Sequence, residues 1–201
     1  MGRRETYRAL LVGRVDDHAV DRLAGYAELL EKWSRKHNLV RFDEPRELID
    51  RHLLDALEGV RLLSGGGRLI DIGSGAGLPG VPLLIARPAW SGVLLEPRQK
   101  RWAFLKLVIR ELGLDAEAIA ARYEDIDDSV GFDLVTSRAV GGQAAILEWA
   151  RSRLHDGGRV AFWTTVEGER EVAREPGWRV LSGPLVGLDR GRLVSLGKCS
   201  T

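Results

Sequence analysis

The sequence predicts an α/β protein in which a mostly parallel sheet carries helices on both faces. From residue 68 onward, short apolar runs alternate with segments of helical periodicity, a pattern typical of parallel sheets. The 201 residues, 44% of them hydrophobic, are enough for one large domain or for a domain with an extension. No internal repeat or low-complexity tract argues for a different architecture.

The N-terminal third is predicted to be helical. Apolar side chains recur at helical spacing over residues 17–37 and 45–63, and Pro45 is tolerated in a first helical turn. The glycine-rich stretch 64–67 then ends the pattern. We therefore expect a helical extension at 1–64 that packs on a core domain at 65–201 and forms a wall of the substrate site.

The remaining elements follow in alternation. Strands are expected at 68–72, 92–96, 116–121, 132–136 and 159–164, with helices at 79–86, 98–112, 142–153 and 166–174. Two later apolar runs, 178–182 and 192–197, are joined by a short segment rich in turn residues. They predict an antiparallel hairpin at one edge of the sheet.

Composition limits the classes of partner. The formal net charge is +1, so the overall charge gives no argument for nucleic acid. Cys199 is the single cysteine, which excludes an intrachain disulfide and a Cys/His zinc pattern, so we expect no metal and a reducing cytoplasm. No apolar run approaches the roughly 20 residues that cross a bilayer, so no membrane partner is expected. A monomer is the default.

The segment DIGSGAGLPG after the first predicted strand fits two binding rules. Gly75, Gly77 and Gly80 have the spacing of a dinucleotide-binding loop. Asp71 followed by Gly73, Gly75 and Gly77 fits a second pattern that begins with an acid. A carboxylate at the strand tip opposes phosphates but favours a cation, and S-adenosylmethionine carries a sulfonium and an ammonium group. The charge of Asp71 therefore favours S-adenosylmethionine over NAD.

Two further charged features accompany this loop. Glu96 ends the second predicted strand, where a carboxylate accepts two hydrogen bonds from a ribose diol; NAD would use the same device. Residues 87–110 hold six basic residues and one acid, so this segment carries +5. Lys100 and Arg101 are predicted at the rim of the site, where they would contact RNA phosphates. The alternative is an ordinary solvated helix face.

The loop DIGSGAGLPGVPL resembles that of the bacterial ribosomal RNA small-subunit methyltransferases known as RsmG or GidB. Further segments that resemble this family are LLEKWSRKHNLV at 29–40, RHLLDAL at 51–57, LLEPRQKRWAFL at 94–105, ARYED at 121–125 and SRAV at 137–140. The resemblance covers about residues 20–160. It implies a Rossmann-like class I methyltransferase that modifies guanine N7 in the 530 loop of 16S rRNA, presented as naked RNA, small subunit or assembly intermediate.

The resemblance, together with the loop's own chemistry, implies roles for matching residues. Cofactor contacts are expected from Asp71, Gly73, Ser74, Gly75, Gly77, Leu78, Glu96, Tyr123, Glu124 and Arg138. Arg138 would also lie beside the incoming base as the catalytic residue, with Glu124 or Asp71 as its carboxylate partner. His52 is expected to contact RNA, although His52 and Asp55 lie three apart on a helix and could simply bond each other.

One position departs from the family pattern. After the fifth strand the family usually carries Lys-Gly, whereas this chain has Thr164-Thr165. A divergent paralogue that methylates a small molecule or another RNA therefore stays open, as does a module that binds an adenosyl ligand without catalysis. Guanine N7 has a free lone pair, so its methylation requires positioning rather than a catalytic base.

Overall fold

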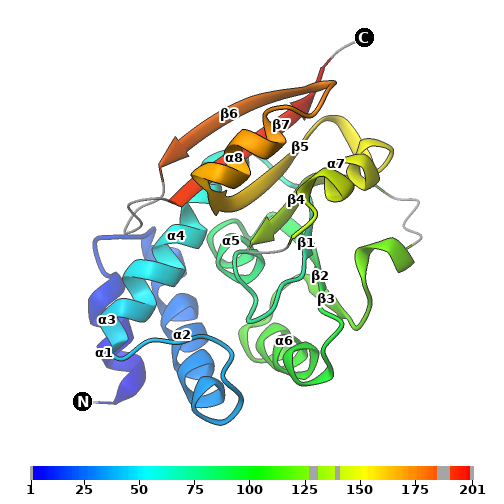
Figure 1. Cartoon of the computed structure of the whole chain (residues 1–201). Helices are drawn as coiled ribbons and strands as arrows, with labels where there is room; N and C mark the ends of the chain where they lie inside the picture. Colours follow the sequence, from blue (N-terminus) through cyan, green and yellow to red (C-terminus); the bar gives the residue numbers. More distant parts are fainter. Residues whose placement is uncertain (1, 127–130, 139–140, 185–190, 200–201) are drawn as a thin grey trace.

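The computed structural model describes residues 2–126, 131–138, 141–184 and 191–199, and it contains a seven-stranded sheet (Figure 1). The strands are β1 (Gly67–Ile72), β2 (Trp90–Leu95), β3 (Ala116–Ile119), β4 (Phe132–Arg138), β5 (Leu154–Thr165), β6 (Trp178–Pro184) and β7 (Gly191–Lys198). Their order is β3-β2-β1-β4-β5-β7-β6; β7 pairs antiparallel with both β5 and β6, and the described pairs among β1–β5 are parallel. The α/β class and the antiparallel edge are thus confirmed.

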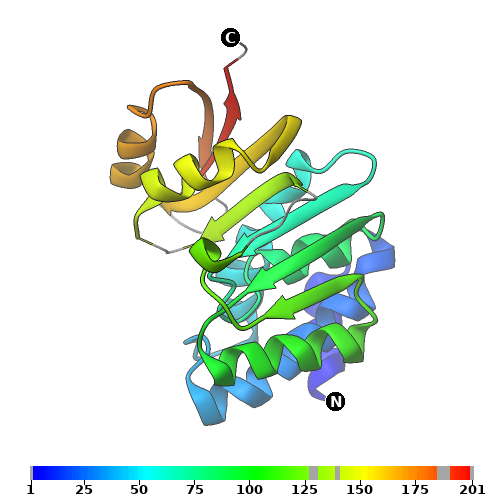
Figure 2. The ribbon, with the colours of Figure 1, turned by 90° about the vertical axis from the view of Figure 1, so that its right-hand side faces the viewer.

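Helices cover both faces of this sheet (Figure 2). They are α1 (Arg3–Leu11), α2 (Asp17–His37), α3 (Pro45–Leu48), α4 (Leu54–Leu57), α5 (Gly80–Ala86), α6 (Gln99–Leu112), α7 (Gln143–Arg151) and α8 (Val166–Val172). Side chains alternate along each strand: Leu69 packs in the core beneath α2, α5 and α6, whereas Ile70 packs beneath α7 and α8. Each inner strand is therefore apolar on both sides, as in other parallel sheets.

The segment 45–63 is helical but not one regular α-helix, which corrects the prediction. A π-helical turn at Ile49–Leu53 separates α3 from α4, and a 3-10 turn at Glu58–Leu62 follows. A π turn closes hydrogen bonds over one more residue than an α turn, so it rotates the residues that follow it. The predicted helix at 17–37 matches α2.

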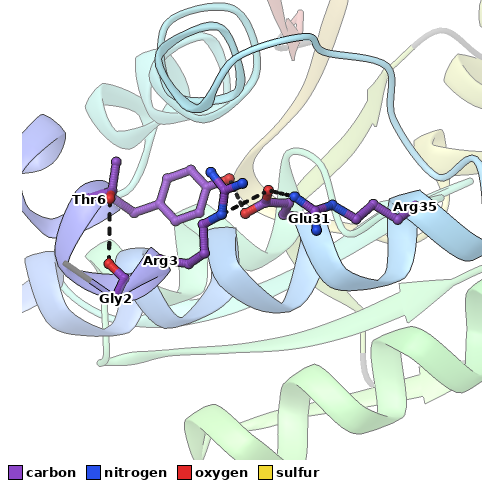
Figure 3. Close-up of polar contacts among 6 residues, drawn as sticks. Gly2, Arg3, Thr6, Glu31 and Arg35 are labelled. Carbon is purple, nitrogen blue, oxygen red and sulfur yellow. Dashed lines mark hydrogen bonds and ion pairs between the residues drawn. The ribbon is translucent and has the colours of Figure 1, made fainter.

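Helix α1 was not predicted, because its nine residues are mostly polar. Its buried residues are Tyr7 and Leu11. The hydroxyl of Tyr7 donates to Glu31 at 3.0 Å, and Glu31 also pairs with Arg35 at 2.7 Å and Arg3 at 3.5 Å. Figure 3 shows the Glu31 carboxylate between the two arginines. These contacts hold α1 against α2.

The N-terminal helices share one apolar core with the sheet. α2 packs on α5 and α6, and α4 packs on α5. The division into an extension at 1–64 and a core at 65–201 stays a prediction. Among the described residues, no helix combines the length and apolarity needed to cross a bilayer.

Strand β5 begins at Leu154 rather than at residue 159. Leu154 pairs with Phe132, and the register then shifts, so Leu134 pairs with Arg159. Residues 155–158 are polar or glycine, so the alternation that reveals a strand is lost at this irregularity. The segment that joins β6 and β7 includes 185–190, so the turn predicted there lies outside the described residues.

Candidate functional site

A cavity of about 710 Å³ opens at the carboxyl ends of β1, β2 and β4. Its lining includes Leu39, Val40, His52, Ile72, Gly73, Ser74, Gly75, Ala76, Leu78, Leu95, Glu96, Pro97, Arg98, Arg101, Ala121, Arg122, Tyr123, Glu124, Arg138 and Gly141. The order of the parallel strands reverses at β1, which lies between β2 and β4. Open α/β sheets bind ligands at this kind of switch point.

The glycine loop after β1 forms the floor of the cavity. Gly73 and Gly75 have φ angles of +68° and +59°, in the left-handed region where glycine carries no steric cost. The amide of Ser74 donates to the carbonyl of Leu95 at 2.8 Å, which ties the loop to β2. Gly77 does not line the cavity; a Cβ there would lie 2.6 Å from Val81, so this glycine is required for packing.

Asp71 lies beneath the loop and not in the cavity, contrary to the expectation that it faces the cofactor. Its side chain is fully buried. Its two oxygens accept from the Ser74 hydroxyl at 2.8 Å, the Thr136 hydroxyl at 2.8 Å and the Gly80 amide at 3.2 Å. Burial raises the pKa of Asp71 to about 6, and these hydrogen bonds oppose the rise. Asp71 therefore fixes the shape of the loop.

Glu96 combines a structural contact with access to the cavity. One carboxylate oxygen accepts from the Gly75 amide at 3.0 Å and the other from the Arg98 amide at 2.8 Å. Each oxygen of a carboxylate offers about two acceptor positions, so capacity remains for hydroxyl groups of a ligand. The residue is buried, yet it lines the cavity, and its contact with a ribose stays a prediction.

Tyr123 and Glu124 line the cavity from a 3-10 turn at Tyr123–Asp125, which follows β3. The Tyr123 ring packs edge-on against Trp149 of α7, with 5.7 Å between ring centroids. The structure thus brings these two residues to the same cavity as Glu96. Arg122, which precedes them, also lines the cavity and was not predicted.

Arg138 ends β4 and lines the cavity, but the carboxylate partners predicted for it are wrong. Its carboxylate partner is Asp55, 3.7 Å away, rather than Glu124 or Asp71. The guanidinium also donates to the backbone carbonyls of Arg51 at 3.3 Å and His52 at 3.4 Å. Burial lowers the pKa of Arg138, whereas the charge of Asp55 raises it. Ala139 and Val140 of the SRAV motif lie outside the described residues.

His52 reaches the cavity from the π-helical turn, and its Nε2 lies 3.3 Å from the carbonyl of Arg41. Burial, and secondly the charge of Arg138, lower the pKa of His52. The side chain of Asp55 pairs with Arg138 and not with His52, so the alternative in which these two simply bond each other is wrong. The N-terminal helical segment does form one wall of the cavity, through His52, Leu39 and Val40.

The six basic residues of 87–110 differ in their contacts. Lys106 lies over the Trp102 ring, 4.9 Å from its centroid. Arg87 pairs with Asp16 at 3.1 Å and Arg110 with Glu111 at 2.8 Å. By contrast, no ion pair involves Arg98, Lys100 or Arg101 within the described ranges. Arg98 and Arg101 line the cavity, whereas the exposed Lys100 lies next to them on α6 without lining it. These three residues are named the basic rim below.

The two threonines that replace the expected Lys-Gly are used within the fold. Thr164 accepts a hydrogen bond from the Gln143 side chain at 2.9 Å. The hydroxyl of Thr165 accepts from the Gly168 amide and caps α8. The departure from the family pattern therefore has a local structural role.

Two residues that support the glycine loop were not predicted from the sequence. The buried hydroxyl of Tyr26, on α2, donates to the carbonyl of Ala76 at 2.7 Å and holds the glycine loop from below. Thr136 binds Asp71 from β4. Thr136 precedes Arg138 by two residues on the same strand, which is a signal that could have identified it. Tyr26 lies in an ordinary apolar stripe and gives no such signal.

Comparisons with known proteins agree with this architecture. The family model described as GidB, rRNA small subunit methyltransferase G, matches residues 19–177. A protein of that name from Laribacter hongkongensis is 38% identical over 87% of each chain, and one from Nitrosospira multiformis is 39% identical over 77% of this chain and 75% of its own.

Solved structures support the fold. A methyltransferase from Geobacter sulfurreducens aligns with a TM-score of 0.64 at 15% identity, covering 98% of this chain and 95% of that one. The cofactor-bound Rv0187 from MTB aligns with a TM-score of 0.66 at 18% identity, covering 98% and 97%. The sheet order, the cavity at its switch point and these sequence matches lead to one conclusion: the chain belongs to the rRNA small subunit methyltransferase G family.

Proposed function

We propose that this chain transfers the methyl group of S-adenosylmethionine to N7 of a guanine in the 530 loop of 16S ribosomal RNA. The observation that carries the proposal is the cavity at the switch point, which joins Glu96, the glycine loop and Arg138 in a member of this family. The resemblance stated above supplies the guanine N7 and the 530 loop. We retain a monomer as the working form.

The residues of the cavity fit an adenosyl cofactor. Glu96 retains acceptor capacity for a ribose diol. The loop backbone at Gly73 and Gly75 carries no Cβ, so a ligand can approach it closely. Tyr123 and Glu124 also line the cavity, where they would flank an adenine. When bound, the cofactor supplies a methyl group on a positively charged sulfur.

Arg138 is proposed as the residue that holds the base. An arginine carries five N–H donors, and two of its nitrogens already bind the carbonyls of Arg51 and His52. Remaining donors can bind O6 of a guanine, which leaves the N7 lone pair free for the methyl group. No side chain has to remove a proton, so catalysis rests on alignment and exclusion of water.

The basic rim is proposed to contact RNA phosphates. Arg98 and Arg101 line the cavity and the exposed Lys100 lies next to them, whereas Arg87 and Arg110 pair with acids and Lys106 lies over the Trp102 ring. Unpaired basic groups at the mouth of a cavity suit a polyanionic substrate. They attract RNA even though the chain as a whole carries only +1.

The proposal is tested by mapping 7-methylguanine in 16S rRNA from a strain that lacks the gene, before and after complementation. Loss and return of the modification in the 530 loop are the expected results, and an unchanged pattern would overturn the substrate assignment. Arg138→Ala should abolish complementation. Arg151→Ala, which removes an arginine paired with Glu148 on α7, is the matched control and should complement fully.

The basic rim needs its own measurement. The double variant of Lys100 and Arg101 to alanine should bind 16S rRNA more weakly, with a salt slope smaller by about 1.5, as expected for two lost phosphate contacts. The matched control is the double variant of Arg87 and Arg110 to alanine. It removes the same amount of positive charge, but from residues that are already paired with acids. Equal losses in both double variants would show that overall charge, not the rim, governs binding.

A further inference from the structure

We propose that Asp55 is a positioning residue that holds Arg138 at the cavity wall and offsets its charge against the cationic sulfur of the cofactor. The inference rests on the proposed function, because it concerns S-adenosylmethionine in the same cavity. Asp55 itself does not line the cavity, so it would contact neither a cofactor nor a base bound there. It acts through Arg138.

The surroundings of Asp55 are unusual for a buried carboxylate. Its side chain is fully buried in the described structure, and neither carboxylate oxygen has a hydrogen-bond partner among the described residues. Buried charged groups are ordinarily hydrogen-bonded, so each exception requires an explanation. The ion pair with Arg138 at 3.7 Å is longer than a hydrogen bond, so Asp55 contributes mainly charge.

The other two buried carboxylates near the cavity are engaged differently. Asp71 accepts hydrogen bonds from two hydroxyls and an amide, and Glu96 accepts from two amides. Those contacts fix the glycine loop. Asp55 makes no such contact, which leaves its negative charge directed at Arg138.

Arg138 receives all of these contacts from one short helical segment. The carbonyls of Arg51 and His52 accept from its two terminal nitrogens, and Asp55 follows one turn later. A π turn at Ile49–Leu53 places these groups around the guanidinium. π turns are frequent at functional sites. The segment therefore holds the Arg138 guanidinium through three contacts.

A cationic cofactor in the cavity would be repelled by Arg138 unless the charge of this arginine is offset. Arg138 lines the same cavity as the cofactor loop, and its side chain is only 19% exposed, so water screens it weakly. Without a counter-charge, Arg138 would repel a bound sulfonium. Asp55 pairs with Arg138 without lining the cavity, and its negative charge offsets part of that repulsion.

Two ligands that differ in charge test the inference. S-adenosylmethionine has a cationic sulfur, whereas S-adenosylhomocysteine has a neutral one and otherwise nearly the same contacts. At pH 8, Asp55→Asn should weaken binding of S-adenosylmethionine on the order of tenfold in calorimetric titration. Binding of S-adenosylhomocysteine should change less than about twofold, and kcat should fall with little change in KM for RNA.

Glu31→Gln is the matched control. Glu31 is a second buried carboxylate paired with arginines, but it lies between α1 and α2, away from the cavity (Figure 3). Glu31→Gln should leave the ratio of the affinities for S-adenosylmethionine and S-adenosylhomocysteine unchanged. In an Arg138→Met background, Asp55→Asn should have no further effect on that ratio, because the charge it offsets is gone.

The outcomes separate the two proposals. If the wild-type chain binds neither adenosyl ligand, the proposed function fails. If it binds both, and Asp55→Asn weakens both equally or neither, the role of Asp55 is overturned while the proposed function stands. A ratio that shifts equally in the Arg138→Met background would show that Asp55 does not act through Arg138.

Discussion

Asp55→Asn should make the folded chain more stable at pH 8 although it impairs function. Burial raises the pKa of Asp55 from 3.8 to about 7, and the nearby Arg138 only partly offsets this rise. The difference is about three pH units, and each corresponds to about 1.4 kcal/mol. The ionised carboxylate therefore costs about 4 kcal/mol of folding free energy at pH 8. Asparagine has nearly the same shape and carries no charge.

The contribution of Asp55 to the free energy of unfolding depends on pH, and the direction of this dependence follows from the raised pKa. Between pH 3.8 and about 7, the folded chain binds more protons at Asp55 than the unfolded chain does. The free energy of unfolding contributed by this group therefore falls as the pH rises through that window. The gain from Asp55→Asn should be about 4 kcal/mol at pH 8 and about 2 kcal/mol at pH 5, and it should vanish below pH 4.

An opposing effect has to be weighed. Removing one partner of a buried ion pair commonly costs about 3–5 kcal/mol, because the other charge is left alone. Here Arg138 keeps the carbonyls of Arg51 and His52 as acceptors, and Asp55 has no hydrogen bond to lose. The burial of the carboxylate therefore dominates. The remaining charges that affect Asp55 are Glu58 and Arg51, both on its own helical segment.

Urea unfolding followed by tryptophan fluorescence at pH 5 and pH 8 measures these differences, since the chain has six tryptophans. A loss of stability at pH 8, or a gain that does not change with pH, would refute the reasoning. A gain in stability combined with a loss of selective cofactor affinity would identify Asp55 as a residue retained for function.

Three other substitutions test the loop. Gly77→Ala should cost about 3 kcal/mol in urea unfolding, because φ is +92° and the new Cβ would clash with buried side chains; Gly113→Ala, at φ +58° in open space, should cost about 1 kcal/mol. Tyr26→Phe leaves the buried carbonyl of Ala76 without its donor and should lower the free energy of unfolding by about 1–2 kcal/mol. Equal stability of the variant and the wild type would contradict the proposal that Tyr26 holds the glycine loop in place. Glu96→Gln should weaken S-adenosylhomocysteine binding by about tenfold or more in calorimetry, whereas an unchanged affinity would place the ribose elsewhere.

The sequence predicted the sheet well because each inner strand is buried on both faces. Its apolar runs are short and bounded by turn residues, so they stand out against the amphipathic helices. Helix α1 was missed for the opposite reason: Tyr7 and Leu11 are its buried residues, and a stripe that sparse does not register as periodicity.

Most of the residues predicted for the site line the cavity, but the contacts between them were not predicted. Glu96 follows a strand end and Arg138 ends one, and parallel strands bring their carboxyl ends to one edge of the sheet. The partner of Arg138 depends instead on how the helical segment that carries Asp55 packs against α5 and Trp163 of β5, and no local sequence pattern encodes that approach. Asp71 illustrates a second limit, because a carboxylate at a strand tip can face the ligand or the core beneath the loop.

The π turn at Ile49–Leu53 also bears on how this segment tolerates insertions and deletions. A π turn is equivalent to one extra residue in an α-helix, and each residue rotates the chain by about 100°. Deleting a single codon within Ile49–Leu53 would restore a regular helix but turn Asp55 away from Arg138. Natural variation in this family should therefore conserve the length of the segment between the cavity wall and β1 more strictly than its exposed side chains.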